Sequence, residues 1–319
     1  MWRLRFDKSV CHPTKSKRSL QDFGIADGAA RTARRGGNGL GERSLTHPDG
    51  AAAHEYARRV IDLATFDARV RESFADLRIE GEQIERIGPL VCVVGGAGGG
   101  FVGYRDLAGA EGSDLDALIA RCVALYASRG ERFEWKLYGH DRPSDLAERL
   151  EAAGFVAEAR ETVEIALAPA IARAPEPPEG VALRWVSERV DLDRIARFEE
   201  AVWGSDRGWL PDMLEGELTA DPESLAIAVA ESGEEIVCAG WVRFARGTGF
   251  ASLWGGSTLP AWRRRGIYRA TVAYRASLAL SRGSRYLRVD ASDQSRPILE
   301  RLGFVPITTT TPYIWSPPA

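Results

Sequence analysis

The sequence predicts an α/β protein of the α+β type, made of two similar domains that are each a mixed, mostly antiparallel sheet flanked by helices. Three observations predict this fold class. Strand-like and helix-like hydrophobic patterns follow one another along the chain. A segment dense in proline and alanine, residues 168–180, divides these patterns into two parts. The same order of elements recurs on both sides of this segment, and 319 residues are enough for two domains.

The composition is that of an ordinary globular protein, with 45% apolar and 27% charged residues. No apolar run approaches the ~20 residues that span a bilayer, so we expect no membrane association. Cys11, Cys92, Cys122 and Cys238 lie far apart and show no C-x-x-C spacing. We therefore expect neither disulfides nor a metal site, and a reducing, cytoplasmic location.

Residues 1–50 are predicted to be a disordered basic extension. They carry ten Lys and Arg against five Asp and Glu, and they lack sustained hydrophobic periodicity. They contain no continuous apolar segment of the kind found in secretory signals, although an organellar presequence remains an alternative. A nucleic-acid-binding tail is a further alternative. We disfavour it because the rest of the chain is acidic and would repel a phosphate backbone.

Residues 51–167 form the first predicted domain. Apolar residues at helical spacing predict its opening helix: Tyr56, Val60, Leu63, Val70, Phe74 and Leu77. The run Gly98–Gly103 matches G-x-G-x-x-G, but a dinucleotide-binding loop must lie between a strand and a helix. Strand-like segments flank this run on both sides, so we expect a hairpin turn. We expect His140 and Asp141 to belong to a polar loop whose hydrogen bonds are satisfied.

An internal repeat relates the two halves of the chain. Shifting the second half back by 149 positions aligns Asp290 with Asp141, Leu299 with Leu150, Glu300 with Glu151, and Gly303-Phe304 with Gly154-Phe155. In each copy the Gly-Phe pair follows a short helix and leads into a strand, Val156–Leu167 in the first and Val305–Trp315 in the second. A period of this length indicates two copies of one domain rather than a solenoid.

The second predicted domain, residues 181–319, contains the following elements in order. They are a strand at Val181–Glu188, a helix capped by Asp191, a helix at Leu210–Leu218, strands at Leu225–Ala230, Ile236–Arg243 and Phe250–Trp254, a helix over 268–281, a strand at Tyr286–Asp290, a short helix ending near 302, and the last strand. In the helix over 268–281 we expect Val272, Ala276 and Ala279 to face inward and Arg275 and Arg282 to face outward.

The most informative segment lies between the third strand of this meander and the helix that follows. Leu253-Trp-Gly-Gly-Ser-Thr-Leu-Pro-Ala-Trp leads into Arg263-Arg-Arg-Gly266-Ile-Tyr-Arg-Ala270. A helix start offers unsatisfied backbone N–H groups and partial positive charge, which suit an anion. Gly266 allows close backbone approach, and four arginines add charge. The pattern predicts a diphosphate site, with a solvated arginine turn as the alternative.

This segment resembles the coenzyme-binding signature of the GNAT superfamily of N-acetyltransferases, L-x-V-x-P-x-x-[QR]-x-x-G-x-[GA]. Thr258 stands at the valine position, and Pro260, Arg263 and Gly266 match the pattern. Tyr268 departs from it, because a small residue is expected there. The segment Ile298-Leu-Glu-Arg-Leu-Gly-Phe304 resembles the family's "LYEKLGF" motif, so the resemblance covers residues 180–316.

The resemblance implies acetyl-CoA as donor and direct transfer to an amine in a ternary complex. It implies that the coenzyme contacts Gly256, Ser257, Thr258, Leu259, Arg263, Arg264, Arg265, Gly266, Ile267, Tyr268, Arg269, Ser292 and Ser295. Gly255-Gly256 is expected to form a bulge that exposes an N–H to the thioester carbonyl, with a simple kink as the alternative. In the first copy the corresponding stretch, 108–115, holds two acids and no base, so we expect this copy to be degenerate and not to bind coenzyme.

The catalytic residues are less evident. Leu299 occupies the position of the tyrosine acid found in many members of the family, and Ser252 that of a glutamate base. The candidates that remain are Asp290, Glu199 and Tyr313, with Glu200 and Asp206 behind them. Asp290 is the first choice, because strand ends in this fold face the cleft; a cap or loop brace is the alternative.

Trp203, Asp206 and Trp209 are the predicted acceptor-binding residues, because ring faces and a carboxylate suit a cationic or aromatic amine. Core packing of both rings is the alternative. The sequence therefore predicts an N-acetyltransferase that acts on a small-molecule amine as a monomer or homodimer, without nucleic acid or membrane partners. The alternative function is a non-catalytic acetyl-CoA-binding regulatory protein.

Overall fold

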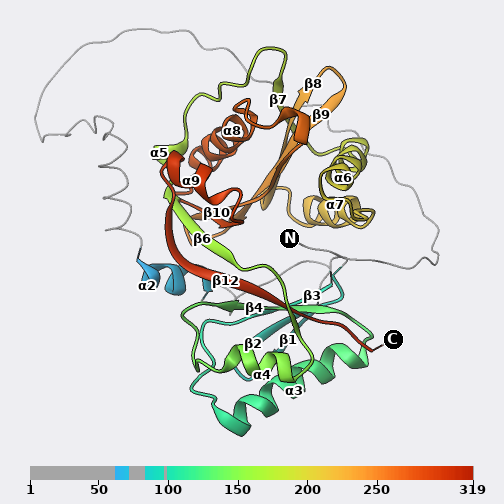
Figure 1. The fold of residues 1–319 in the computed structure, drawn as a ribbon, viewed down its shortest axis with the longest axis vertical. Helices are drawn as coiled ribbons and strands as arrows, with labels where there is room; N and C mark the ends of the chain where they lie inside the picture. Colours follow the sequence, from blue (N-terminus) through green and yellow to red (C-terminus); the bar gives the residue numbers. More distant parts are fainter. Residues whose placement is uncertain (1–61, 72–82, 97–98, 319) are drawn as a thin grey trace, which may run out of the picture.

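The computed structural model describes residues 62–71, 83–96 and 99–318 (Figure 1). The predicted basic extension lies outside the described residues. So do Tyr56, Val60, Phe74 and Leu77 of the predicted opening helix and Gly98 of the glycine-rich run.

Over the described ranges, twelve strands form one sheet. The first half of the chain supplies β1 (Gln83–Ile87), β2 (Leu90–Val94), β3 (Gly100–Gly103), β4 (Phe133–Tyr138), β5 (Val156–Ala157) and β6 (Glu161–Leu167). The second half supplies β7 (Ala182–Val186), β8 (Leu225–Ser232), β9 (Glu235–Ala245), β10 (Phe250–Thr258), β11 (Tyr286–Ala291) and β12 (Val305–Trp315). Most neighbouring strands are antiparallel, while β3 with β4 and β10 with β11 are parallel. The predicted α/β fold class is confirmed.

The two halves exchange their last strands. The strand order is β1-β2-β3-β4-β12-β6-β11-β10-β9-β8-β7, with β5 pairing β12 beside this path. Strand β6, from the first half, pairs with β11, whereas β12, from the end of the chain, pairs with β4. Both strands run through the middle of the molecule and join its two lobes (Figure 1). The halves are similar, as predicted, but their sheets are continuous, which the sequence pattern did not indicate.

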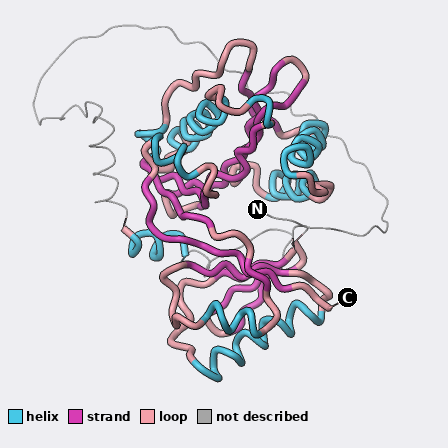
Figure 2. Tube along the Cα trace, viewed as in Figure 1, coloured by secondary structure: helices cyan, strands magenta, loops and turns pink. Residues whose placement is uncertain are grey.

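Helices cover both lobes (Figures 1 and 2). They are α2 (Leu63–Phe66) with a π-helical turn over Asp67–Arg71, α3 (Gly112–Ser128), α4 (Leu146–Ala152), α5 (Ala168–Ile171), α6 (Arg189–Trp203), α7 (Leu210–Ala220), α8 (Ile267–Ser281) and α9 (Arg296–Leu302). In the second half, α6 and α7 pack on one face of the sheet, and α8 and α9 pack on the other. Over the described ranges, no helix has both the length and the apolarity needed to cross a membrane.

The core of the first lobe shows how the sequence pattern becomes packing. Helix α3 buries Leu115, Ile119, Cys122 and Tyr126, which are spaced so that they fall on one face. They meet aromatic side chains of β4 and β12, and each fully buried aliphatic side chain contributes roughly 1.5–3 kcal/mol. Trp315, the last residue of β12, belongs to this core because β12 is exchanged.

Three local predictions need correction. Helix α6 begins at Arg189 rather than after Asp191, because Asp191 is buried in the first turn and forms a bidentate ion pair with Arg184. The strand predicted over Val156–Leu167 is interrupted between β5 and β6. The prediction that Arg275 faces outward is wrong, since only 1% of it is exposed.

Two predictions for the first half are confirmed among the described residues. Strand β2 precedes the glycine-rich run and β3 forms its Gly100–Gly103 part, and the two strands pair as an antiparallel hairpin. Asp141 accepts hydrogen bonds from Arg71 (2.7 Å) and Tyr104 (2.6 Å), so its carboxylate is satisfied. His140 contacts Asp67 and the hydroxyl of Thr308, and it braces the same network.

Strand exchange predicts that the two halves stay together when the chain is cut. Residues 172–178 lie in neither a helix nor a strand, and a protease site placed at 174–178 would be cleaved in the folded protein. Because each fragment completes the sheet of the other, both should coelute in size-exclusion chromatography after cleavage and separate only in denaturant. Two separate peaks under native conditions would contradict the exchange.

Candidate functional site

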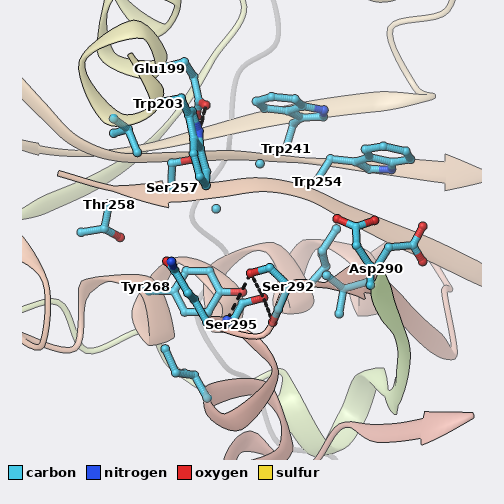
Figure 3. A pocket seen from close by; sticks show the side chains of 18 of the residues that line it. Glu199, Trp203, Trp241, Trp254, Ser257, Thr258, Tyr268, Asp290, Ser292 and Ser295 are labelled. Carbon is cyan, nitrogen blue, oxygen red and sulfur yellow. Dashed lines mark hydrogen bonds between the residues drawn. The ribbon is translucent and has the colours of Figure 1, made fainter. Parts of the chain in front are cut away.

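A cleft of about 1140 Å³ opens in the second lobe and reaches the first. Its walls include the end of β10, the start of α8, the turn after β11 and part of α6 (Figure 3). Glu134 and Lys136 of β4 and the 158–161 segment line its far end. The cleft therefore reaches the boundary between the two halves, where β6 and β12 are exchanged. We call this boundary the seam.

The cleft exists because two parallel strands part. Strands β10 and β11 are paired only from Phe250 to Ser252 and from Tyr286 to Arg288. Beyond these residues the ladder ends, and both strand ends line the cleft. Open backbone edges of this kind leave hydrogen-bonding groups available to an extended ligand.

A β-bulge lies at the open end of β10, as predicted. The register with β9 shifts between Gly255 and Ser257, so Gly256 has no partner residue in the ladder. Gly256 has φ +83°, and a Cβ there would lie 2.8 Å from the ring of Tyr268. A Cβ on Gly255 would lie 2.8 Å from Trp241. Only glycine fits this backbone, and the bulge leaves Gly256 outside the ladder at the wall of the cleft.

The start of α8 forms an anion cradle. Gly266 caps the helix with φ +84°, and the N–H of Ala270 bonds to the Gly266 carbonyl at 3.0 Å. The three N–H groups before Ala270 therefore have no acceptor within the helix. They lie at its positive end and line the cleft, together with four arginines: Arg263, Arg264, Arg265 and Arg269.

The structure brings the predicted coenzyme contacts together with one exception. Gly256, Ser257, Thr258, the whole of 263–269, Ser292 and Ser295 line the cleft, whereas Leu259 does not. The N–H of Leu259 is instead bonded to the carbonyl of Val237. Ser292 and Ser295 contact each other near Tyr268, with 3.3 Å between their hydroxyl oxygens (Figure 3).

Glu199 of α6 lies beside the bulge. Its Oε2 accepts hydrogen bonds from Trp203 Nε1 at 2.7 Å and from Ser257 Oγ at 3.3 Å (Figure 3). Only 5% of Glu199 is exposed, and burial raises its pKa. A buried carboxyl with a raised pKa, adjacent to the residue after the bulge, is a candidate general base.

Asp290 reaches the cleft from the end of β11, but it is held by two cations. Lys136 Nζ lies 2.7 Å and Arg288 Nη2 2.8 Å from its Oδ2. Burial alone would raise the pKa of Asp290. The charges of Arg288 and Lys136 outweigh this effect and lower the pKa to about 2. This pairing disfavours Asp290 as a proton acceptor near neutral pH.

The remaining predicted residues divide between the cleft and other places. Trp203 and Trp209 line the cleft. Asp206 is exposed outside it and accepts a hydrogen bond from the N–H of Gly208. Tyr313 packs in the core of the first lobe, because β12 pairs with β4 rather than staying with its own half.

Sequence reasoning missed the floor of the cleft. Trp241 and Trp254 are direct partners across β9 and β10, so both indoles lie on the α6–α7 face. The register of the two strands could have indicated this pair. The first half adds Glu134, whose pKa burial raises to about 7, although the charge of Lys136 opposes the rise. This contribution depends on strand exchange, for which the sequence carries no signal.

Buried polar atoms without a hydrogen-bond partner among the described residues gather in this cleft. They include Glu134 Oε1, Glu199 Oε1, Trp209 Nε1, Trp241 Nε1, Trp254 Nε1 and Arg288 Nε. Buried polar groups without partners are costly. A cluster of them indicates a site for a polar ligand.

Comparison with solved structures identifies the fold. The chain is similar to a GCN5-related N-acetyltransferase from Kribbella flavida, with a TM-score of 0.58, 16% identity, and coverage of 82% of this chain and 98% of that one. A second such protein, from Sphaerobacter thermophilus, has a TM-score of 0.53, 19% identity and coverage of 84% and 94%.

A tandem GNAT protein from the clavulanic acid biosynthesis pathway has a TM-score of 0.53, 12% identity and coverage of 76% and 86%. No protein-family model matches the chain, and the search of curated proteins finds no match. The chain therefore has the GNAT fold, and the predicted resemblance is confirmed at the level of fold.

The bulge predicts a specific cost for a side chain at position 256. Gly256→Ala and Gly249→Ala both place a Cβ on backbone with positive φ, but only the first meets a neighbour, since Gly249 has nothing within 4 Å. Gly256→Ala should lower the free energy of unfolding by about 1–3 kcal/mol more than Gly249→Ala. Denaturant unfolding of both variants measures this. Equal losses would mean that Tyr268 does not pack on the bulge.

Proposed function

We propose that this chain, with the fold of the GCN5-related N-acetyltransferases, transfers the acetyl group of acetyl-CoA to the amine of a small molecule. One observation carries the proposal: the anion cradle of α8 and the glycine bulge of β10 line a single slot between parted strands. A cradle for phosphates and an open strand edge suit the two ends of a coenzyme A molecule.

Different residues of the slot would bind different parts of the coenzyme. The N–H groups of residues 264–269 and the surrounding arginines would bind the diphosphate. Ser257 and Thr258 on the open edge of β10, with Leu259 next to them, would pair with the pantetheine arm, and Ser292 and Ser295 would flank it. The bulge at Gly256 would direct a backbone N–H at the thioester carbonyl. Bound acetyl-CoA supplies the activated acetyl group.

Glu199 is the proposed general base. An amine attacks only in its neutral form, so a carboxylate or a water beside the bulge must take its proton. Glu199 contacts Ser257, and burial has raised its proton affinity, which suits this role. The proposal includes direct transfer in a ternary complex and does not use Asp290 or Tyr313 as acid or base.

The acceptor would lie over the indole floor, between α6 and the seam. Ring faces of Trp203 and Trp209 attract cationic or aromatic amines, and Trp241 and Trp254 extend this surface. In the first half, α3 begins after Glu111 and carries Asp114 in its first turn, which would repel phosphates. We therefore propose that this half does not bind coenzyme but contributes Glu134 and Lys136 to the acceptor side.

The proposal includes a cytoplasmic location, on the grounds of cysteine spacing, and a monomer or homodimer that acts without nucleic acid or membrane. The alternative, a non-catalytic acetyl-CoA-binding regulator, predicts the same cradle but gives no role to the buried carboxyl of Glu199. Assay of thiol release over a panel of amines separates the two. Binding of acetyl-CoA without turnover of any amine would favour the regulator.

Changing the cradle tests coenzyme binding directly. Arg264→Ala combined with Gly266→Asp removes one cation and introduces a like charge at the helix start, so the Kd of acetyl-CoA should rise at least about tenfold. Isothermal titration calorimetry measures this change. Glu111→Ala and Asp114→Ala at the start of α3 are matched controls and should leave the Kd unchanged. If the controls abolished binding and the cradle variant did not, the coenzyme would belong to the other half.

Glu199→Gln tests the base. Loss of a general base should lower kcat by about 10²–10⁴-fold. Burial in the folded state raises the pKa of Glu199, so the free energy of unfolding of the wild type should fall as pH rises through that pKa. Glu199→Gln has no ionisable group at this position and should not show this fall in stability. The variant should therefore melt at a higher temperature than wild type at alkaline pH, with little difference at acidic pH.

Glu200→Gln, one residue further along α6 and outside the cleft, is the control and should keep activity. A Glu199→Gln variant with wild-type kcat would remove Glu199 from the mechanism.

A further inference from the structure

Tyr268 reaches the bulge from the first turn of α8, where the coenzyme motif has a small residue. A Cβ on Gly256 would lie 2.8 Å from Tyr268 Cε2, so the ring rests on the bulge. The phenolic oxygen is bonded to the carbon next to Cε2, so the hydroxyl is two bonds away from the ring atom that meets the bulge. Tyr268 lines the cleft, and in Figure 3 its ring lies beside Ser292 and Ser295, below the strand ribbon that carries Ser257.

A buried cation lies behind the bulge. This cation is Arg275, which lies further along α8 than Tyr268. Its Nε donates to the Thr271 carbonyl at 3.2 Å. Its Nη1 donates to the carbonyls of Trp241 at 3.2 Å and Trp254 at 2.8 Å. A Cβ on Gly256 would lie 3.4 Å from its Nη2.

Arg275 forms no ion pair with any carboxylate in the part of the chain that the structure describes. Buried charges are normally paired, because desolvation of an ion costs several kcal/mol. Arg275 therefore lacks the permanent counter-anion that such a position calls for. An anion that forms beside the bulge during a reaction would supply one.

We propose that Tyr268 is the catalytic acid that protonates the departing sulfur of coenzyme A, and that Arg275 is a positioning residue that stabilises the phenolate left behind. This inference rests on the proposed acetyl transfer and extends it. Within the cleft, Tyr268 is a phenol placed on the bulge where the thioester carbonyl would be bound, with the cation directly behind it.

The step balances in atoms and charge. The amine nitrogen forms a bond to the acetyl carbon, and the bond between that carbon and sulfur breaks. The sulfur takes the electron pair of the broken bond and the proton of Tyr268, while Glu199 takes a proton from the amine. Glu199 then returns one proton to Tyr268 through solvent, so the products are the N-acetyl amine and coenzyme A.

The electrostatics around the phenol set its protonation state. Burial raises the pKa of Tyr268 to about 12, and the charge of Arg275 opposes that rise. Tyr268 is therefore protonated at neutral pH, and Arg275 makes its proton easier to remove than burial alone would allow. The other titratable group that faces it is Cys238 of β9, which burial keeps as a neutral thiol by raising its pKa.

Tyr268→Phe tests the acid while keeping the ring on the bulge. The Kd of acetyl-CoA should stay within about twofold of wild type, and kcat should fall by about 10²–10⁴-fold. Tyr274→Phe is the matched control, since Tyr274 lies on the same helix but stacks on Trp185 outside the cleft. This control should behave as wild type in both measurements.

The thiol of bound coenzyme A gives a readout that does not depend on turnover. A hydrogen-bond donor and a cation both favour a thiolate, so the pKa of the bound thiol should be lower in wild type than in free coenzyme A. Tyr268→Phe should raise it again by about one unit. Arg275→Lys, which keeps the charge, should shift it less than Arg275→Gln. Ultraviolet absorbance of the thiolate in the complex measures these values.

Wild-type kcat and an unchanged thiol pKa in Tyr268→Phe would overturn the inference and leave the acetyltransferase proposal standing. Loss of acetyl-CoA binding in Tyr268→Phe would also overturn it, because the hydroxyl would then be a binding contact. Binding without turnover in wild type would instead defeat the proposed function, and the thiol pKa would still decide whether Tyr268 donates to the sulfur.

Discussion

The end of hydrogen bonding between β10 and β11 is the constraint on which the site depends. While the two strands are paired, the sheet is closed and its side chains form a core. Once they part after Ser252 and Arg288, one strand edge must find partners outside the sheet. The bulge at Gly256 turns this edge outward, and the free N–H groups of α8 continue it as a row of donors. The ligand site is therefore built mainly from backbone, and side chains adjust it.

Strand exchange adds charged residues of the first half to this site. Because β12 and β6 join β4 to β11 in one sheet, charged residues from the two halves of the chain meet in one cluster. Lys136 of the first half and Arg288 of the second share Asp290, and Glu134 lies next to this cluster. The first half therefore shapes the cleft both by packing and by the polar groups that it places there.

The fold was largely predictable, because its elements follow local rules. Helical spacing indicated α6 and α8, and the Gly255-Gly256 pair indicated the bulge. Strand exchange was not predictable, since β6 and β12 have equivalent positions in the repeat and either could pair with β11. The position of Arg275 followed from spacing, as it is three residues after Val272 and four before Ala279. Its charge led to the opposite expectation, because a buried arginine without a carboxylate is rare. Tyr313 was therefore misplaced because of the strand exchange, and Arg275 because of its charge.

The position of β12 after the strands of the second lobe has a consequence for biosynthesis. The first lobe needs Val305–Trp315 beside β4 and Trp315 in its core, and the ribosome makes these residues only after β7–β11 of the second lobe. Until then β4 presents an open edge, and such edges are sites of mispairing with other chains. The lobe whose synthesis begins first can thus finish folding only after the second lobe has been made.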